Sequence, residues 1–265
     1  TGMNDDFEAI DKAVTEFNKK TGNQLCIHVD AASGGFILPF LKPHVKWDFR
    51  LNNVLSISTS GHKYGLVYPG LGWVIWKDKK SLPSQMAFSV NYLGADITQV
   101  GLNFSRPAAQ VLGQYYQFIR LGFQGYKAIQ QNSMEIAEYL HAEIGKMPQF
   151  KNYSNELVNP LFIWSLNPKY DKVANWTLYD LQYKLQQNGW MVPAYTLPKD
   201  LEQCVVMRIV CRQGFSRDMA DMLLTDIRMA VADLEKLSYP TQSRVEVNRN
   251  IHPKPSFNHG GKKSH

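Results

Sequence analysis

Two side chains that could carry out chemistry follow two predicted strands. Asp30 ends an apolar run in HVDAASGG (28–35), and Lys63 lies in SGHKYG (60–65), directly after the run VLSIST (54–59). Open α/β sheets bind ligands outside the carboxyl ends of their strands, so we expect both side chains at one edge of a sheet. A lysine placed near positive charge or in an apolar pocket loses its proton more readily and attacks carbonyl groups.

This pair indicates a particular cofactor chemistry. A lysine forms a Schiff base with an aldehyde and a carboxylate keeps a pyridinium nitrogen protonated, and pyridoxal phosphate enzymes require both partners. Ser60, the backbone of Gly61 and His62 stand next to Lys63 and suit a phosphate group. Taken alone, Asp30 could equally cap the following loop, and a single loop lysine is usually only solvated. Together the two residues predict a pyridoxal phosphate site.

The elements that must position these residues follow an α/β pattern. A helix is predicted over 5–22, with Gly22 as its C-cap, and buried strands at 25–29, 54–58 and 71–77. Three strands are few for an open sheet, and a helix precedes the first of them. We therefore expect the chain to be the C-terminal part of a larger protein.

Beyond about residue 150 the pattern changes to a smaller α+β arrangement. Strands are predicted at 161–166 and 205–211, and helices at 177–189 and 216–237. The expected organisation is the C-terminal part of a large cofactor-binding domain, a small C-terminal domain and a flexible basic tail, at 1–148, 149–240 and 241–265.

The charge distribution argues against a nucleic-acid partner. The chain carries a net charge of +6, but four of these charges lie between residues 242 and 265, so the body is close to neutral. No apolar run approaches the roughly 20 residues that span a bilayer. Cys26, Cys204 and Cys211 form an odd set without metal-ligand spacing, which favours a reducing, cytoplasmic setting and no metal site.

Four segments together resemble bacterial and plant glutamate decarboxylases: HVDAASGGF, SISTSGHKYG, NFSRPAAQ and VVMRIVCRQGF. The resemblance runs through nearly the whole chain and is weakest at 147–175 and in the tail. It implies the type I, aspartate-aminotransferase-like fold of pyridoxal-phosphate-dependent enzymes, with an incomplete large domain and a small α+β domain. It also implies pyridoxal 5'-phosphate as cofactor and the conversion of L-glutamate to 4-aminobutyrate (GABA) and CO2.

The resemblance also implies roles for residues around the lysine. Lys63 is similar to the catalytic lysine that holds the cofactor, and Asp30 to the aspartate that pairs with the pyridine nitrogen. Ala32 resembles the small residue packed on one face of the ring. Ser60 and His62 resemble the phosphate ligands beside the lysine, and His62 is also a candidate catalytic residue.

Other implied roles lie further along the chain. Ser105 resembles a serine that reaches the phosphate of a neighbouring subunit, which implies a homodimer or a larger homo-oligomer. Arg208, otherwise a surface strand residue, resembles the arginine that binds the substrate's α-carboxylate. His259 best matches a tail histidine that meets the cofactor at neutral pH in similar bacterial enzymes, with His265 as the alternative. Such a pH gate implies a role in acid resistance.

Several parts of that family have no counterpart in this sequence, among them the first strands and the serine-containing phosphate loop. We therefore expect the complete protein to be the enzyme and the 265-residue chain to be inactive alone. Two alternatives stay open. The protein could decarboxylate another amino acid, or the chain could be a non-catalytic fragment that acts as an oligomerisation or interaction module.

Overall fold

The computed structural model describes residues 2–90, 94, 97–99 and 106–248. Contacts divide the chain into two compact units, one formed by Asn4–Asn132 and the other by the residues from Ser133 onward together with the first three residues. The division falls inside one long helix, α3 (Ala109–Gly145). The domain boundary expected after residue 148 stays a prediction. The last turns of this helix, which bury Leu140 and Ile144, cluster with the second unit.

The first unit begins with helix α1 (Phe7–Thr21), as the sequence predicts. The Asp6 side chain caps its start by accepting a hydrogen bond from Ala9 N at 3.0 Å. Gly22 ends it in the left-handed conformation, with φ of 74°, and its N–H donates to Asn18 O. A left-handed C-cap is the conformation in which glycine is favoured over other residues.

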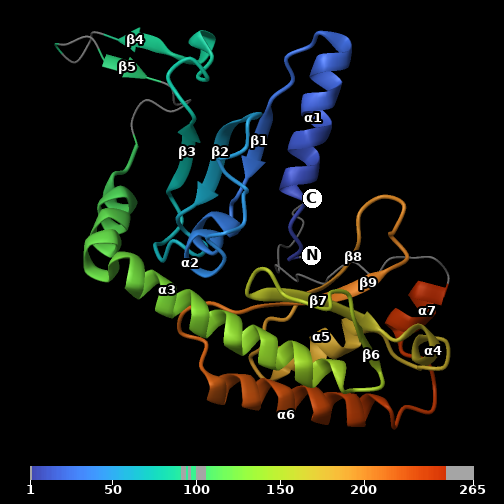
Figure 1. Ribbon diagram of the computed structural model, residues 1–265. Coiled ribbons are helices and arrows are strands. Elements are labelled where there is room, and N and C mark those ends of the chain that lie inside the picture. The colour runs from blue at the N-terminus through green and yellow to red at the C-terminus, as the bar shows by residue number, and fades with distance from the viewer. Residues whose placement is uncertain (1, 91–93, 95–96, 100–105, 249–265) are drawn as a thin grey trace, which may run out of the picture. The chain divides into compact units, whose positions relative to one another are not determined.

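Three strands form the sheet of this unit in the order β1–β2–β3 (Figure 1). They span Ile27–Asp30, Val54–Ser60 and Gly72–Trp76. Strands β1 and β2 run parallel, and β2 and β3 run antiparallel. Two short helices, η1 (Gly34–Phe36) and α2 (Leu38–Leu41), lie in the segment that follows β1. This segment and the strands share a hydrophobic core. The buried residues of that core are Val29, Ala31, Leu38, Trp47, Leu51, Val54 and Ile57.

Strand β1 was predicted to be buried, and that prediction is only half right. Val29 is buried, whereas His28 and Asp30 are exposed. Side chains of a strand alternate between its two faces, so a four-residue strand packed on one side exposes every second residue. The exposed face of β1 is therefore polar, and its residues stand beside Ser56, which is buried, and Ser58, which is half-buried, in β2.

A short hairpin precedes helix α3, and a kink interrupts the helix. A short helix η2 (Ser84–Met86) leads into a hairpin of β4 (Phe88–Val90) and β5 (Ile97–Gln99), which pair antiparallel. Within α3, Gly122 has φ of 55° and ψ of −169°, so the helix is kinked there. Glycine adopts this conformation without the steric penalty that a side chain would bring.

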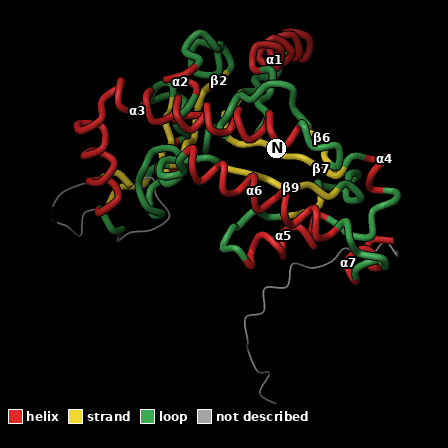
Figure 2. Tube along the Cα trace, turned by 90° about the horizontal axis from the view of Figure 1, so that it is seen from below, coloured by secondary structure: helices red, strands yellow, loops and turns green. Residues whose placement is uncertain are grey.

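The second unit is a four-stranded antiparallel sheet with helices, in the order β6–β7–β9–β8. The predicted strands and helices are confirmed, with small shifts at their ends. Helix α5 packs against α6 and contacts β8 and β9 (Figure 2). The elements are β6 (Phe150–Asn152), β7 (Leu161–Leu166), α4 (Pro168–Asp171), α5 (Leu178–Gln187), β8 (Ala194–Thr196), β9 (Val205–Val210) and α6 (Arg217–Leu234).

The start of the segment predicted as a flexible tail is a docked helix, α7 (Gln242–Asn248). Its Arg244 is only 6% exposed and donates from Nη2 to Asp171 Oδ1 at 2.7 Å. The same guanidinium donates to Trp176 O. Thr241 and Ser243 add hydrogen bonds to the Asp180 carboxylate at 2.9 and 2.6 Å. A buried, hydrogen-bonded arginine thus holds this segment in place.

The three cysteines are free thiols, with Cys26 exposed, Cys204 half-buried and Cys211 buried. Cys211 lies directly after β9, and its N–H donates to Pro160 O. Burial raises the pKa of the Cys211 thiol to about 12, because the thiolate is poorly solvated there. Among the described helices, none combines the length and the apolar character that a membrane crossing requires.

Candidate functional site

The carboxyl ends of β1 and β2 lie at one edge of the first sheet, which we call the carboxyl edge. Asp30 stands opposite Ser58 in the parallel register. The pairing continues past the strand ends, since Ala31 N donates to Ser58 O at 2.8 Å and Ser60 N donates to Ala32 O at 3.2 Å. The loop after Asp30 and the end of β2 are therefore held together.

Asp30 is exposed and makes one hydrogen bond to its own loop. Its Oδ1 accepts from Ala32 N at 3.1 Å, which is the geometry of an Asx turn. The other carboxylate oxygen, Oδ2, has no hydrogen-bond partner within the described chain. The structure thus bears out the loop-capping interpretation through one oxygen and leaves the second oxygen available to a ligand.

His28 is a site candidate that the sequence analysis missed. It lies two residues before Asp30 on the same face of β1, and its ring nitrogens contact two serines of β2. Nδ1 lies 2.8 Å from Ser56 Oγ, and Nε2 lies 3.2 Å from Ser58 Oγ. The spacing His-Val-Asp was the available signal, because alternation along a strand puts the first and third residues on one face.

The lysine turn, residues 61–66, follows β2 directly. Its backbone is partly anchored by the contact of Lys63 N with Ser60 O at 3.3 Å. Gly61, Tyr64 and Gly65 are buried, whereas the Lys63 side chain is exposed. Within the described chain its Nζ has no ion pair and no hydrogen bond. The turn therefore presents a primary amine that no other described residue of this unit holds.

The predicted phosphate ligands are Ser60, which directly precedes this turn, and His62, which lies within it; both are half-buried. His62 Nδ1 lies 3.4 Å from Leu71 O, a long contact in which a carbonyl can only accept. Ala32, half-buried, lies in the loop directly after Asp30.

The remaining predicted residues lie in the second unit or outside the described residues. Arg208 belongs to β9 in the second unit, where its exposed side chain lies between buried Met207 and Ile209. Its guanidinium lies 5.7 Å from the centre of the Tyr195 ring and has no ion pair in the described chain. Ser105 and the tail histidines, His259 and His265, lie outside the described residues.

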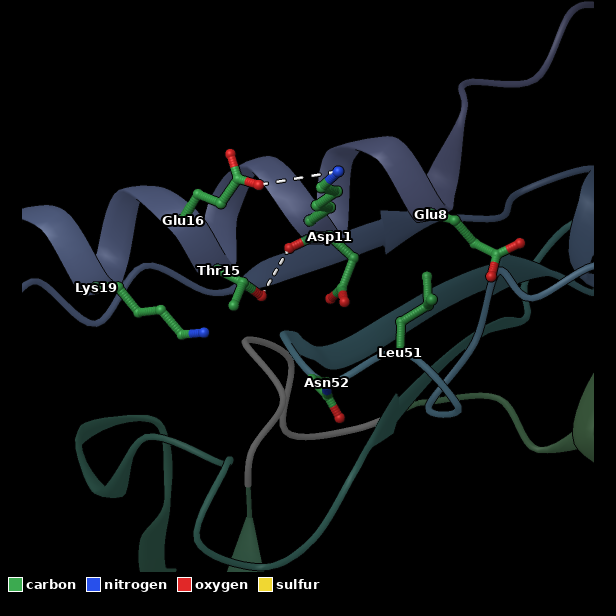
Figure 3. A pocket seen from close by; sticks show the side chains of 8 residues that line it. Glu8, Asp11, Thr15, Glu16, Lys19, Leu51 and Asn52 are labelled. Atoms are coloured by element: carbon green, nitrogen blue, oxygen red, sulfur yellow. Dashed lines mark hydrogen bonds and ion pairs between the residues drawn. The ribbon is translucent and has the colours of Figure 1, made fainter.

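A cavity of about 390 Å³ lies elsewhere in the first unit and includes none of the predicted site residues (Figure 3). Two of its polar residues, Asp11 and Thr15, are hydrogen-bonded. Asp11 Oδ1 accepts from Asn53 N at 2.8 Å, and Thr15 Oγ1 donates to Asp11 O at 2.9 Å. Asp11 therefore ties α1 to the loop before β2. The cavity is lined by Glu8, Asp11, Lys12, Thr15, Glu16, Lys19, Leu51 and Asn52.

Comparisons with known proteins agree with the chemistry of the carboxyl edge. Residues 1–166 match the family model described as the pyridoxal-dependent decarboxylase conserved domain. The chain belongs to the pyridoxal-dependent decarboxylase family. Its fold is accordingly the type I, aspartate-aminotransferase-like fold, of which the two units form a part.

Named relatives of this decarboxylase chain are similar over most of its length. It is 47% identical over 234 residues to glutamate decarboxylase beta of Listeria monocytogenes, covering 88% of this chain and 50% of the relative. It is 48% identical over 236 residues to glutamate decarboxylase of Lactococcus lactis, covering 89% of this chain and 50% of the relative. The solved glutamate decarboxylase of Lactobacillus brevis matches with a TM-score of 0.83 and 47% identity, covering 89% of this chain and 53% of that one.

The decarboxylase chain thus spans about half the length of the curated relatives it matches. That this half is the C-terminal one remains a prediction. The cofactor of the family is pyridoxal phosphate. The groups at the carboxyl edge fit it: a free amine on Lys63, a free carboxylate oxygen on Asp30, and the hydroxyl and imidazole of Ser60 and His62.

Proposed function

We propose that the full-length protein decarboxylates L-glutamate to 4-aminobutyrate and CO2 with pyridoxal phosphate. The observation that carries this proposal is the pair of Asp30 and Lys63 at the ends of two paired parallel strands, in a chain of the decarboxylase family. The choice of glutamate is supported by the relatives, which are named glutamate decarboxylases and are 47–48% identical to this chain.

Each residue at the carboxyl edge has a defined part in this proposal. The Nζ amine of Lys63 attaches the cofactor covalently, and the free Oδ2 of Asp30 accepts a hydrogen bond from a protonated ring nitrogen. Ser60 donates its hydroxyl hydrogen to the phosphate, and His62 contributes its ring on the same side. Ala32 leaves room for the ring because its side chain is one methyl group. Bound pyridoxal phosphate withdraws electrons from the bond that breaks.

Groups away from this edge complete the proposed site. The planar guanidinium of Arg208 suits a bidentate contact with the α-carboxylate of the substrate. Ser105 would serve the phosphate of a second subunit, so the enzyme would be at least a homodimer. Both assignments rest on the sequence resemblance.

We further propose a role in acid resistance, with the tail as a pH gate. Decarboxylation takes up one proton for each CO2 released. A neutral His259 imidazole can meet the cofactor, whereas protonation near its ordinary pKa of about 6.5 favours a solvated tail. Removing residues 256–265 from the full-length enzyme should therefore extend activity toward neutral pH, and His259→Ala should do so in part. An unchanged pH profile in both variants would exclude the gate.

The main test of the proposed function is the substitution Lys63→Ala in the full-length protein. After borohydride reduction, wild-type protein should carry the cofactor covalently in the peptide that contains residue 63, and the variant should carry none and release no CO2 from glutamate. Lys80→Ala, which removes another exposed lysine of the same unit, is the matched control and should behave as wild type. Cofactor attached to another lysine in the variant would refute the assignment, and a panel of amino acids would identify the preferred substrate.

A further inference from the structure

Helix α3 binds the lysine turn through buried side chains. Gln114 Nε2 donates to Gly65 O at 2.7 Å, and Tyr126 donates its hydroxyl hydrogen to the same oxygen at 2.9 Å. Gln130 Nε2 donates to Tyr64 O at 2.8 Å. The two carbonyls that directly follow Lys63 in the chain are therefore held by three side chains of one helix, which passes near the carboxyl end of β2 (Figure 1).

These three side chains, which we call the turn clamp, form a connected group. Gln114 Nε2 also donates to the Tyr126 hydroxyl at 2.9 Å. Gln114 and Gln130 are fully buried, and Tyr126 is 1% exposed. The kink at Gly122 separates Gln114 from Tyr126, and both side chains still reach the same carbonyl. Burial raises the pKa of Tyr126 to about 12, so the phenol keeps its donor hydrogen at physiological pH.

The glycines of the SGHKYG motif fit against the turn clamp. A methyl group added at Gly61 would lie 2.6 Å from Gln114 Oε1, and one added at Gly65 would lie 2.8 Å from the same atom. Both distances are shorter than any real contact of a Cβ atom. The Gln114 amide therefore occupies the space that side chains at these two positions would need.

The same helix makes further contacts with the last residue of the turn and just beyond it. Gln110 Oε1 accepts a hydrogen bond from Tyr68 N at 3.0 Å, and Gln117 Nε2 makes a long contact with Leu66 O at 3.4 Å. Glutamines on α3 thus follow the backbone from residue 64 to residue 68. Their repeated use against main-chain atoms indicates that they fix the path of this segment.

The turn clamp also carries a cost in stability. The carbonyl oxygens of Gln114 and Gln130 are buried without a hydrogen-bond partner in the described chain. A buried polar atom left unpaired is unfavourable, so it partly offsets the stability that the hydrogen bonds of the turn clamp contribute. Buried polar groups are kept in some proteins because they select one conformation among several. Here the conformation selected is that of the lysine turn.

We propose that Gln114, Tyr126 and Gln130 are positioning residues for Lys63. They touch the turn and not the reacting atoms, and they set the direction in which the Lys63 side chain leaves the backbone. The proposal rests on the function proposed for Lys63. Reacting groups must be aligned closely, and a displacement of about 1 Å can cost roughly 100-fold in rate.

The test compares two tyrosine-to-phenylalanine substitutions on α3 in the full-length enzyme. Tyr126→Phe removes one hydroxyl of the turn clamp and keeps the ring, which stacks on Phe36 and Phe40. Tyr139→Phe is the matched control, because it also removes one hydroxyl hydrogen bond of α3, the one to Asp221 Oδ1. The readouts are the rate at which apoenzyme binds pyridoxal phosphate covalently and the pH dependence of the visible absorbance of the bound cofactor.

Tyr126→Phe should attach the cofactor about tenfold more slowly and shift the pH midpoint of its absorbance, while KM for glutamate stays near the wild-type value. Tyr139→Phe should match wild type in all three. Gln114→Met, which keeps the side-chain volume, should reproduce the defect of Tyr126→Phe.

Several outcomes would overturn the proposal. Wild-type attachment rates and spectra in both turn-clamp variants would do so, and so would a failure of both variants to fold, since that would show a purely structural role. Lys63→Ala separates the two hypotheses. If it abolishes covalent cofactor while Tyr126→Phe changes nothing, the turn clamp fails and the proposed function stands. If it retains covalent cofactor, the function assigned to Lys63 fails first.

Discussion

A single methyl group at Gly65 is expected to disturb the lysine turn. The added Cβ of Gly65→Ala would lie 2.6 Å from Gly61 O, 2.8 Å from Gly61 Cα and 2.8 Å from Gln114 Oε1. Two of these three atoms belong to the backbone and cannot rotate out of the way. The third belongs to a fully buried side chain that is hydrogen-bonded to the turn. The turn itself must therefore move.

The size of the effect follows from these contacts. Inserting a methyl group into a packed interior usually costs about 1–3 kcal/mol. The entropy of unfolding is about 2.1 cal/mol/K per residue, so in a protein about twice as long as this chain the melting temperature should fall by about 1–3 °C. The change should also weaken the hydrogen bonds of the turn to Gln114 and Tyr126, because their common acceptor is Gly65 O.

The assay is thermal unfolding of the full-length apoprotein, together with hydrogen exchange measured on peptides that cover residues 60–68. Gly113→Ala is the matched control. It adds the same methyl group on α3, where the new Cβ would lie 3.7 Å from Val67 Cγ1, an ordinary contact. Alanine is also favoured over glycine within a helix by roughly 1 kcal/mol, so this variant should melt at or above the wild-type temperature.

Wild-type behaviour of Gly65→Ala would refute the expected disturbance of the lysine turn. If Gly65→Ala melts with wild type and exchanges its amide hydrogens over residues 60–68 at the wild-type rate, the turn accommodates the methyl group freely. The contacts that define the turn clamp would then not constrain the backbone at Lys63. Equal losses in both alanine variants would instead show a general effect of substitution near α3.

Other substitutions test the site and the second unit. Asp30→Asn should leave the cofactor bound while lowering turnover at least about 100-fold, because an amide does not keep the ring nitrogen protonated; a near-normal rate would leave Asp30 as a loop cap. Arg244→Met should lower the free energy of unfolding by about 1–3 kcal/mol in urea titrations, because the carbonyl of Trp176 loses its donor, and an unchanged midpoint would contradict this. The pKa of the Cys211 thiol rises from its ordinary value of 9.0 to about 12, so the folded protein keeps that proton to higher pH than the unfolded chain does. This thiol should therefore lower the free energy of unfolding by about 1.4 kcal/mol per pH unit between about pH 9 and 12. If Cys211→Ala shows the same dependence of unfolding free energy on pH as wild type, the prediction is wrong.

Local sequence patterns were sufficient for most of the regular elements. Helix α1 was predictable because Asp6 caps its start and Gly22 its end, both through contacts within a few residues. The longer strands β2, β7 and β9 were predictable from apolar runs. Strands of three residues, such as β6 and β8, were missed because they are too short to show a period of two.

The sequence by itself determined the two residues on which the proposed chemistry rests. An aspartate and a lysine at the ends of apolar runs are chemically distinctive, and the residues around them carry the likeness to decarboxylases. Neither fact depends on the packing of distant segments.

Only the tertiary structure decided how these residues are supported. The parallel register that pairs Asp30 with Ser58 joins segments far apart in the chain, and so does the reach of Gln114 and Tyr126 to Gly65 O. The sequence did not predict that α7 docks through Arg244. The carboxylate and carbonyl that bind this arginine lie far from it in the chain, and without them a basic residue is interpreted as solvated. Composition and periodicity report local preference, whereas hydrogen bonds between side chains and a distant backbone exist only after the chain has folded.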